Sequence, residues 1–386
     1  MKIYHIYARN YNFGDHALGL ATRNLIREYF YDQIIFNTID THEYWINKHE
    51  IDRLNSDGDL VLVGGGGLIH TFALNGRAWM FHLPTCLIDK LCTPLVIFAV
   101  GFNQFRDESM QLHPGVVENL RRIQLQALSF SVRNDRSGEM LEKNGIIPDV
   151  IPDPGFFLDD DYPIPDDVDR PYAILQLAYD CKKSRGIGTE QFIENMVQVV
   201  DYITNSGYSV VIAPHCKPDN EISRVVQSRA MLRSRVIIWN YYTSISDDLI
   251  RYSLGYYKHA EFVVGMRGHA QIIPWGMGIP FVTIANHRKH IDLLKDTIMS
   301  KYIVDIRDLS AKCIIEKIEL LSKNRNSLAD YLRGSTQEMR YQMEKYIKEM
   351  RVKYENTPRK RSCSYYRIGR RLRAMSAEMM RKTIYK

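Results

Sequence analysis

Short apolar segments alternate with amphipathic segments along most of this chain, and this alternation constrains the fold more than any other feature. In the first half, strand-sized runs such as residues 59–63 (DLVLV) and 94–100 (PLVIFAV) are separated by longer stretches. Those stretches, such as residues 17–30 and 115–128, carry apolar side chains at helical spacing. This arrangement is typical of parallel strands joined by crossover helices. The pattern therefore predicts an α/β fold.

The alternation is interrupted once. Residues 159–171 (DDDYPIPDDVDRP) are acidic and rich in proline, and we interpret them as a linker. Strand-like and helix-like segments then resume, including a helix that we expect to be capped by Thr189 and stopped by Gly207. We predict two tandem Rossmann-like domains with a cleft between the carboxyl ends of their strands. The expected divisions are an N-terminal domain over 1–160, the linker over 159–171, a C-terminal domain over 172–310, a helical region over 311–355 and a tail over 356–386.

Charge is distributed unevenly between the body and the tail. Residues 355–386 contain ten Lys and Arg against two Glu, a net of +8, so the rest of the +6 chain carries −2. A near-neutral body argues against nucleic acid binding by the core. The tail mixes its arginines with Tyr, Leu and Met, which fits either an amphipathic segment on an anionic membrane surface or a solvated end.

The cysteines and the N-terminus indicate the compartment. The six cysteines are scattered without a CxxC pair, the chain starts directly on MKIYHIYA, and no apolar run reaches the length of a membrane span. We expect a cytoplasmic protein with reduced thiols, which the tail would hold peripherally at the inner face of the cell membrane.

Polar and glycine-rich loops follow the predicted strands of the first half. The run Gly64–Gly67 comes directly after DLVLV, where its main-chain N–H groups could approach an anionic ligand. Tight packing of strand against helix explains the run equally well. It matches neither a dinucleotide fingerprint nor a P-loop. Asp15 follows Gly14 at a predicted helix start, where capping is the simpler explanation.

Cationic residues and histidines follow several strands in both halves. Each is a common loop residue when taken alone. Together they suit a small, highly charged anion and a proton transfer, because guanidinium groups bind carboxylate and phosphate and histidine titrates near neutral pH. Gly268 would permit a bend that turns its two neighbours to one side. The candidates are Arg133, His215, Arg267, His269 and Lys289.

Several motifs occur in an order that resembles the polysaccharide pyruvyl transferase family over about residues 10–290. They include NYNFGDHAL, LVLVGGGGLIH, SVRNDRSGEML and MRGHAQIIPWGMGIPFVTI. The resemblance implies a two-domain fold of the glycosyltransferase B (GT-B) type. It also implies transfer of the enolpyruvyl unit of phosphoenolpyruvate onto two hydroxyls of a sugar, in a capsule, an exopolysaccharide or a lipid-linked precursor. The product would be a pyruvate ketal, with release of phosphate.

The resemblance also implies roles for individual residues. Arg267 and His269 match the Arg-x-His motif of the family, and Arg133 corresponds to its arginine in the first half. We expect both arginines to hold the donor and His269 to protonate the methylene carbon, with His215 and Lys289 assisting donor binding. No metal and no cofactor beyond the donor substrate is expected. The acceptor is expected against the N-terminal half, near Asp15, Gly64, Gly65, Gly66, Gly67, His70 and Asn103.

Two departures from the family pattern fall on the acceptor side. His16 replaces the usual acidic residue after Gly-Asp, and the strand ending at residues 101–104 (GFNQ) lacks the usual Gly-Pro ending. Two other functions stay open from the residues alone. One is a glycosyltransferase of the same fold with a nucleotide-sugar donor, and the other is a glycan-binding scaffold without catalysis.

Overall fold

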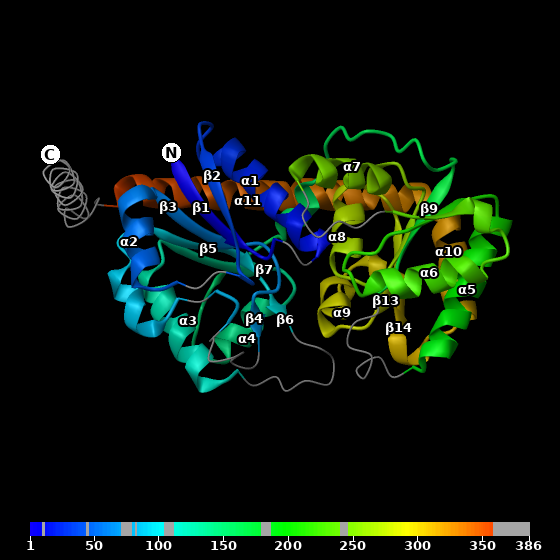
Figure 1. The fold of residues 1–386 in the computed structure, drawn as a ribbon, viewed down its shortest axis with the longest axis horizontal. Helices are drawn as coiled ribbons and strands as arrows, with labels where there is room; N and C mark the ends of the chain where they lie inside the picture. Colours follow the sequence, from blue (N-terminus) through cyan, green and yellow to red (C-terminus); the bar gives the residue numbers. More distant parts are fainter. Residues whose placement is uncertain are drawn as a thin grey trace, which may run out of the picture.

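The protein folds into two parallel α/β halves placed side by side (Figure 1). The computed structural model describes residues 1–9, 12–43, 46–70, 79–81, 83–103, 112–178, 187–239 and 246–357. The basic tail, for which an amphipathic segment was predicted, thus lies outside the described residues beyond position 357.

The first half is built on a parallel sheet. In sheet order its strands are β2 (Ile35–Asp40), β1 (Lys2–Tyr7), β3 (Leu60–Gly64), β5 (Leu95–Val100), β7 (Ser129–Arg133) and β8 (Asp149–Ile151). A short separate pair joins β4 (Ile69–His70) to β6 (Phe102–Asn103). The helices are α1 (Phe13–Tyr29), α2 (Lys48–Asp57), α3 (Pro114–Gln126) and α4 (Ser137–Glu142), with the 3₁₀ turns η1 (Thr85–Lys90) and η2 (Pro154–Phe157).

The second half repeats the plan. Its parallel strands, in sheet order, are β11 (Val236–Ile238), β10 (Ser209–Ile212), β9 (Tyr172–Gln176), β12 (Val263–Gly265), β13 (Phe281–Ala285) and β14 (Ile303–Asp305). Its helices are α5 (Thr189–Asn205), α6 (Asp219–Arg229), α7 (Asp247–Lys258), α8 (His269–Gly276) and α9 (Arg288–Leu294), with η4 (Arg233–Arg235), η5 (Ile298–Tyr302) and η6 (Ile306–Asp308). The predicted α/β class with parallel sheets is confirmed.

The apolar runs read from the sequence are the buried strands of these sheets. Every residue of β3, β5, β9 and β13 is buried, because helices cover both faces of a parallel sheet of this kind. One predicted detail is wrong: α5 begins at Thr189, but its N-cap is Gly188, which makes no side-chain capping bond. Gly207 does follow the helix end in the left-handed region, with φ +94°.

Two helices close the chain, α10 (Ala311–Lys323) and the long α11 (Arg325–Asn356). In Figure 1, α11 runs along both halves. It contacts the second half where Trp275 Nε1 donates to Ser335 Oγ at 2.8 Å. It contacts the first half where the hydroxyls of Tyr346 and Ser129 lie 2.7 Å apart. The helix thereby ties the two halves together.

The segment predicted as a linker, residues 159–171, is attached along α7. Arg251 forms an ion pair with Asp160 at 2.9 Å, and Tyr256 donates its hydroxyl proton to Asp167 at 2.6 Å. Tyr162 is buried, although the composition of the segment indicated little to bury. The domain limits themselves stay a prediction.

A polar bridge joins α1 in the first half to α7 in the second. Arg23 is buried, and its Nη2 lies 2.6 Å from Asp247 Oδ1, while Nη1 donates to the Tyr7 hydroxyl at 3.1 Å. His16 Nε2 lies 3.5 Å from the same carboxylate. We call Arg23, His16 and Asp247 the α1–α7 bridge. It gives His16, the departure from the family pattern, a contact between the halves.

Candidate functional site

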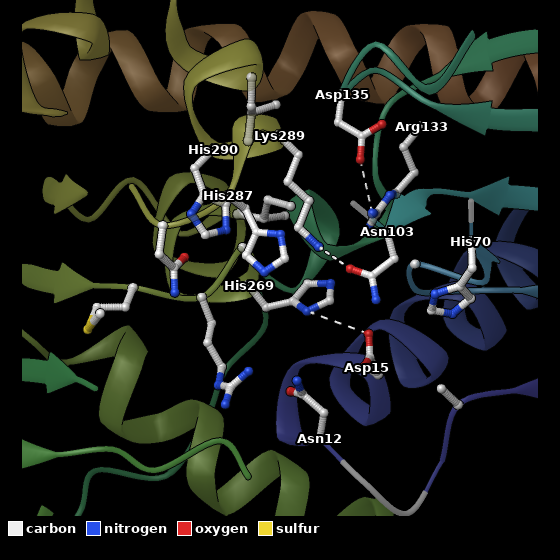
Figure 2. Close-up of a pocket in the computed structure, with 18 of the residues that line it drawn as sticks. Asn12, Asp15, His70, Asn103, Arg133, Asp135, His269, His287, Lys289 and His290 are labelled. Carbon is white, nitrogen blue, oxygen red and sulfur yellow. Dashed lines mark hydrogen bonds and ion pairs between the residues drawn. The ribbon is translucent and has the colours of Figure 1, made fainter. Parts of the chain in front are cut away.

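A cavity of about 290 Å³ lies where the carboxyl ends of the two sheets face each other (Figure 2). This is the position at which open α/β sheets bind ligands, because loops of both sheets converge there. Its lining is dominated by polar side chains from both halves. They are Asn12, Asp15, His42, His70, Asn103, Arg133, Asp135, Arg267, His269, Asn286, His287, Lys289 and His290.

His269 is the first residue of α8 and faces the cavity. Its Nδ1 lies 3.8 Å from Asp15 Oδ1, and its buried Nε2 has no hydrogen-bond partner in the described protein. Burial lowers the pKa of His269 to about 4, against the opposing effect of the Asp15 carboxylate. The imidazole is therefore neutral at pH 7 until something raises this pKa.

Lys289, at the start of α9, is the cation most open to an anionic ligand. Its Nζ lies 3.4 Å from the amide oxygen of Asn103, and no carboxylate of the described chain lies within ion-pair distance (Figure 2). Burial, together with the nearby charge of Arg133, lowers the pKa of Lys289 to about 8. The ammonium is still mostly charged at neutral pH.

Arg133 ends β7 and reaches the cavity already paired. Its Nη2 lies 2.9 Å from Asp135 and its Nη1 2.9 Å from Asp153. Burial disfavours the charged guanidinium, but these two carboxylates outweigh burial and raise its pKa. The Nε atom is buried, and no atom of the described residues accepts a hydrogen bond from it. Gly101 makes room for the guanidinium, since a Cβ there would overlap with it.

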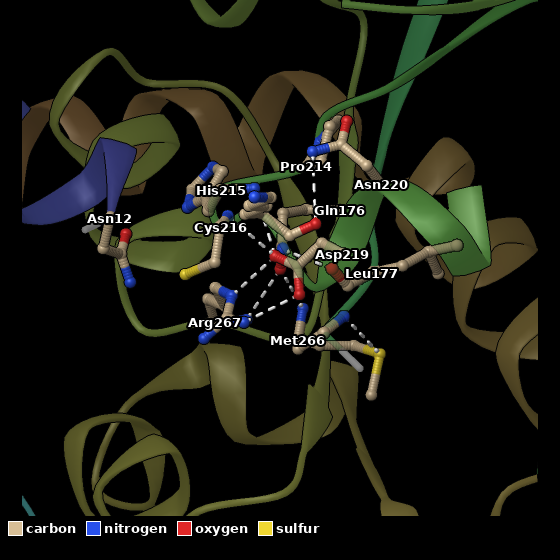
Figure 3. Close-up of polar contacts among 12 residues, drawn as sticks. Asn12, Gln176, Leu177, Pro214, His215, Cys216, Asp219, Asn220, Met266 and Arg267 are labelled. Carbon is tan, nitrogen blue, oxygen red and sulfur yellow. Dashed lines mark hydrogen bonds and ion pairs between the residues drawn. The ribbon is translucent and has the colours of Figure 1, made fainter. Parts of the chain in front are cut away.

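Arg267, between β12 and α8, also lines the cavity and also has a carboxylate partner (Figure 3). Its Nε donates to Asp219 Oδ2 at 2.9 Å and its Nη2 to Asp219 Oδ1 at 2.7 Å. One edge of the guanidinium fork is thus committed to a buried side chain of α6. The expected bend at Gly268 is wrong, because that residue has ordinary helical angles (φ −53°, ψ −45°).

The prediction that His215 contacts the donor is corrected. His215 is fully buried outside the cavity lining, with Nε2 2.7 Å from the Tyr257 hydroxyl. Its ring stacks on Trp239 and packs against Phe13. Burial holds the pKa of His215 well below its ordinary value. The apolar surroundings, which a single loop sequence does not reveal, make it a packing residue.

The glycine run divides between the two explanations that the sequence left open. A Cβ at Gly64 would overlap with the backbone of Phe98 in β5, so this glycine serves strand packing. Gly65 and Gly66 have φ values of +88° and +103°, which only glycine adopts readily. Of the four, Gly67 lines the cavity, and Gly64, Gly65 and Gly66 are corrected to structural positions.

The predicted acceptor-side residues His70 and Asn103 are brought together by the short β4–β6 pair, in which they are direct partners. Both line the cavity, as does Asp15 in the first turn of α1. Burial, followed by the charges of Lys289 and His42, lowers the pKa of His70 to about 4. These three residues are part of the wall that the first half contributes.

Other cavity residues were not predicted as site residues. His290 is fully buried behind Lys289, and neither of its ring nitrogens has a hydrogen-bond partner in the described protein. Asn286 Oδ1 is also without one. Both follow β13, and their position at a strand end was the available signal. His42 follows β2 in the same way.

The cavity is chemically suited to a small anion and to proton transfer. Buried polar atoms in proteins normally have hydrogen-bond partners, so the unpartnered nitrogens of His269, His290 and Arg133 point to a missing polar ligand. The N-termini of α1 and α8 also lie at the cavity, and helix N-termini favour negative charge. No group of side chains in the described ranges has the composition of a metal site.

Comparison with known proteins gives one family match. A family model described as polysaccharide pyruvyl transferase matches residues 12–288, which is most of the chain. The match includes Asp15, Arg133, Arg267 and His269 of the cavity and ends just before Lys289 and His290. No curated protein sequence matches the chain.

Several solved structures resemble the fold at low sequence identity. A Listeria monocytogenes protein assigned as a UDP-N-acetylglucosamine 2-epimerase has a TM-score of 0.58 at 14% identity, covering 93% of this chain and 98% of its own. S. aureus MnaA with UDP has a TM-score of 0.53 at 14% identity, covering 86% and 90%. The Methanocaldococcus jannaschii UDP-GlcNAc 2-epimerase, with UDP-GlcNAc and UDP, has a TM-score of 0.50 at 13% identity, covering 83% and 92%. These likenesses show the predicted GT-B type of fold.

Proposed function

The chain belongs to the polysaccharide pyruvyl transferase family, and from this membership we propose that it transfers the enolpyruvyl group of phosphoenolpyruvate to a sugar. Two hydroxyls of that sugar, in a cell-surface polysaccharide or its lipid-linked precursor, form a pyruvate ketal, and phosphate is released. The observation that carries the proposal is that Lys289 and His269 both line this one cavity. Among the described residues, the Lys289 ammonium has no carboxylate partner there, and the neighbouring His269 Nε2 has no hydrogen-bond partner.

Donor binding is supported by the electrostatics of the second half. Phosphoenolpyruvate carries a phosphate and a carboxylate on three carbons, so its site needs positive charge in a small volume. Lys289 supplies a full charge, and the N-terminus of α8 adds a partial one. Arg133 and Arg267 add positive charge at the cavity, although each is already paired with a carboxylate. Lys289 therefore contributes more to binding the anionic donor than the two arginines do.

His269 acts as the general acid. It donates a proton to the methylene carbon of the donor, so that the electron pair of the double bond forms the new C–H bond and the central carbon becomes electrophilic. Burial keeps His269 neutral in the free protein, with a pKa of about 4. The negative charges of a bound donor raise that pKa, so the acid is charged only when the donor is present.

The acceptor is held by the first half, at Asp15, Gly67, His70 and Asn103. A sugar hydroxyl adds to the central carbon, the C–O bond to phosphate breaks, and the second hydroxyl closes the ketal. Of the two hydroxyl protons released overall, one replaces the proton given to the methyl group and the other leaves with phosphate.

A nucleotide-sugar donor is less well supported by this cavity. Such a donor commonly needs a free carboxylate for its ribose hydroxyls. Asp219, the acidic residue that follows β10, is fully buried and bonded to Arg267. We further propose that the reaction needs no metal, because the cavity cations supply the charge that a metal would provide.

Release of the leaving group tests the proposal. The full-length protein is incubated with either phosphoenolpyruvate or a panel of nucleotide sugars, together with p-nitrophenyl hexosides, in the presence of a chelator. We expect phosphate release from phosphoenolpyruvate that depends on the hexoside. Nucleotide release would support a glycosyltransferase instead, and release of neither would favour a binding scaffold.

The variant His269→Ala tests the general acid. Positioned proton transfer contributes roughly 10²–10⁴-fold to a rate, so kcat should fall by that factor while KM for phosphoenolpyruvate changes little. His49→Ala is the matched control, because this histidine of α2 is 77% exposed at its side chain and lies outside the cavity lining. Equal turnover of the two variants would remove His269 from the mechanism.

A further inference from the structure

The cavity holds a second histidine whose surroundings differ from those of His269. His42 lies in the loop after β2, in the first half, and lines the cavity from the side proposed for the acceptor. Its side chain is 35% exposed, so a sugar in the cavity can reach it, whereas that of His269 is 10% exposed.

Asp40, the last residue of β2, fixes the orientation of this histidine. Its Oδ1 lies 2.8 Å from His42 Nδ1 and also accepts the backbone N–H groups of His42 at 3.0 Å and Arg9 at 3.3 Å. An ionised carboxylate only accepts hydrogen bonds, so Nδ1 of His42 carries the proton. In the neutral imidazole, Nε2 is then the basic nitrogen. This is the arrangement in which a buried carboxylate holds a histidine in the tautomer of a general base.

The charges around His42 favour its role as a proton acceptor. Burial acts to lower the pKa of His42, but the hydrogen bond and charge of Asp40 outweigh it, and Asp15 and Glu43 add to the increase. The net pKa of His42 lies above its ordinary value, so the imidazole is a stronger proton acceptor than a free histidine. His70 also faces this part of the cavity, and the charges of Lys289 and His42 help burial to lower its pKa.

Other cavity residues are weaker candidates for this task. Burial lowers the pKa of His70 to about 4, which makes it a poor proton acceptor. Asp135 forms an ion pair with Arg133 at 2.9 Å. Asp15 lies beside His269, so its carboxylate interacts with the proposed general acid and is less available to an acceptor hydroxyl.

We propose that His42, positioned by Asp40, is the general base that takes the proton from the first acceptor hydroxyl. This inference rests on the proposed function. As the hydroxyl oxygen bonds to the central carbon of the protonated donor, its O–H bond breaks and the proton moves to His42 Nε2. Phosphate then leaves with the electron pair of the C–O bond and takes that proton.

The proton of the second acceptor hydroxyl completes the catalytic cycle. The second hydroxyl closes the ketal and gives its proton to His269, which had lost one to the methyl group. Both histidines thus return to their starting states, and the products are the ketal and hydrogen phosphate. His42 touches the reacting hydroxyl, while Asp40 acts through His42.

Steady-state kinetics of the full-length protein test this assignment, with phosphoenolpyruvate and p-nitrophenyl hexosides as probes. His42→Gln should lower kcat by roughly 10²–10⁴-fold with KM for phosphoenolpyruvate unchanged. In His42→Ala, added imidazole should restore part of the lost rate. His49→Gln, an exposed histidine outside the cavity lining, is the matched control.

Asp40→Asn gives a readout that a structural role would not move. A general base must be neutral, so activity falls as the pH drops below the pKa of His42. Without the Asp40 carboxylate that pKa decreases, and the acid limb of the profile of kcat/KM for the hexoside should shift to lower pH. An unshifted limb, together with no rescue by imidazole, would overturn the assignment.

The outcomes separate the two levels of the proposal. If the wild-type protein releases no phosphate with any probe, the proposed function fails and the base assignment fails with it. If the wild-type protein turns over and His42→Gln turns over equally well, the function stands and His42 is not the base. Loss of turnover in His42→Gln, rescue of His42→Ala by imidazole and a shifted acid limb in Asp40→Asn together support both the function and the base assignment.

Discussion

At the scale of single residues, Gly14 sets how closely the two halves approach at the cavity. It lies in the first turn of α1, and a Cβ at this position would overlap with the ring of His269 from α8. The sequence predicted this glycine for a tight turn, but its structural requirement is close approach. The position of His269, the proposed general acid, therefore depends on the absence of a side chain at Gly14 across the cleft.

Gly14→Ala should lower kcat strongly, because the added methyl group displaces His269. Misplacement of a reacting group by about 1 Å can cost 10²-fold in rate. Turnover and thermal unfolding are measured together. The matched control is Gly334→Ala in α11, where the added Cβ would have no atom of another described residue within 4 Å. An alanine in place of a helical glycine should raise the free energy of unfolding by up to about 1 kcal/mol. Equal activities in the two variants would contradict the role given to this contact.

Lys289 should make donor affinity depend on pH. The ammonium is charged below its pKa of about 8 and neutral above it, so KM for phosphoenolpyruvate should rise as the pH passes 8. The phosphate has its second pKa near 6, so the charge of the ligand does not change in this window. In Lys289→Met, KM should be high and independent of pH. Lys312→Met, which alters an exposed lysine, should behave as the wild type does.

The sequence predicted several of the residues that converge, though not His42 or His290, and it did not predict what they contact. Arg133, Arg267, His269 and Lys289 all line the cavity, because each follows a parallel strand and strand ends of one sheet share an edge. Arg267 and Asp219 are 48 positions apart, and their pairing depends on how β12 and α6 pack. Such tertiary contacts leave no local pattern. Arginines expected to be free for a ligand are therefore partly occupied.

At the scale of elements, the α1–α7 bridge connects the halves on one side of the cavity. Arg23 is buried in α1, and the carboxylate of Asp247 in α7 compensates its positive charge. The hydrogen bond from His16 and the charge of Arg23 lower the pKa of Asp247 well below its usual range. Stability from this carboxylate is therefore complete above the ordinary pKa of about 4 and is lost as the pH falls.

Asp247→Asn should reduce the free energy of unfolding at pH 7 by about 1–2 kcal/mol, since a buried guanidinium loses its charged partner while solvent screens a half-exposed site. Denaturant unfolding at several pH values measures this loss. The difference in unfolding free energy between the variant and the wild type should narrow below about pH 4. Asp248→Asn, one position along and exposed, is the control. An equal loss of unfolding free energy in Asp248→Asn would contradict the stabilising role of the α1–α7 bridge.

Periodicity predicted the elements better than their packing. The apolar runs became buried parallel strands, and the helical region after residue 310 became α10 and α11. The pattern did not indicate that α11 returns to the first half, because an amphipathic stripe specifies a buried face but not its partner. Composition predicted a linker over residues 159–171 but did not indicate that this segment contacts α7.

At the scale of the whole molecule, α11 brings the start of the tail to the half proposed to hold the acceptor. Near its end, Glu355 accepts a hydrogen bond from the Tyr31 hydroxyl at 2.9 Å. No helix within the described ranges is long and apolar enough to cross a membrane. A lipid-linked acceptor would place this half near a membrane surface, and we propose that the basic tail binds that surface.

Liposome sedimentation tests this arrangement. The full chain should sediment with vesicles that contain phosphatidylglycerol, and less with neutral phosphatidylcholine vesicles or at high salt, because the attraction is electrostatic. A variant that ends at residue 357 should remain in the supernatant. Unchanged sedimentation of the shortened chain would assign membrane binding to another surface or exclude it.

The most direct test of the central claim is the mass of the product formed from phosphoenolpyruvate in deuterium oxide. Transfer by protonation of the methylene carbon predicts that the p-nitrophenyl hexoside gains one pyruvate less one water, with one solvent deuterium fixed in the new methyl group. The same product should be nearly absent with His269→Ala. A hexoside that is unmodified, or a ketal without deuterium in its methyl group, would contradict the mechanism.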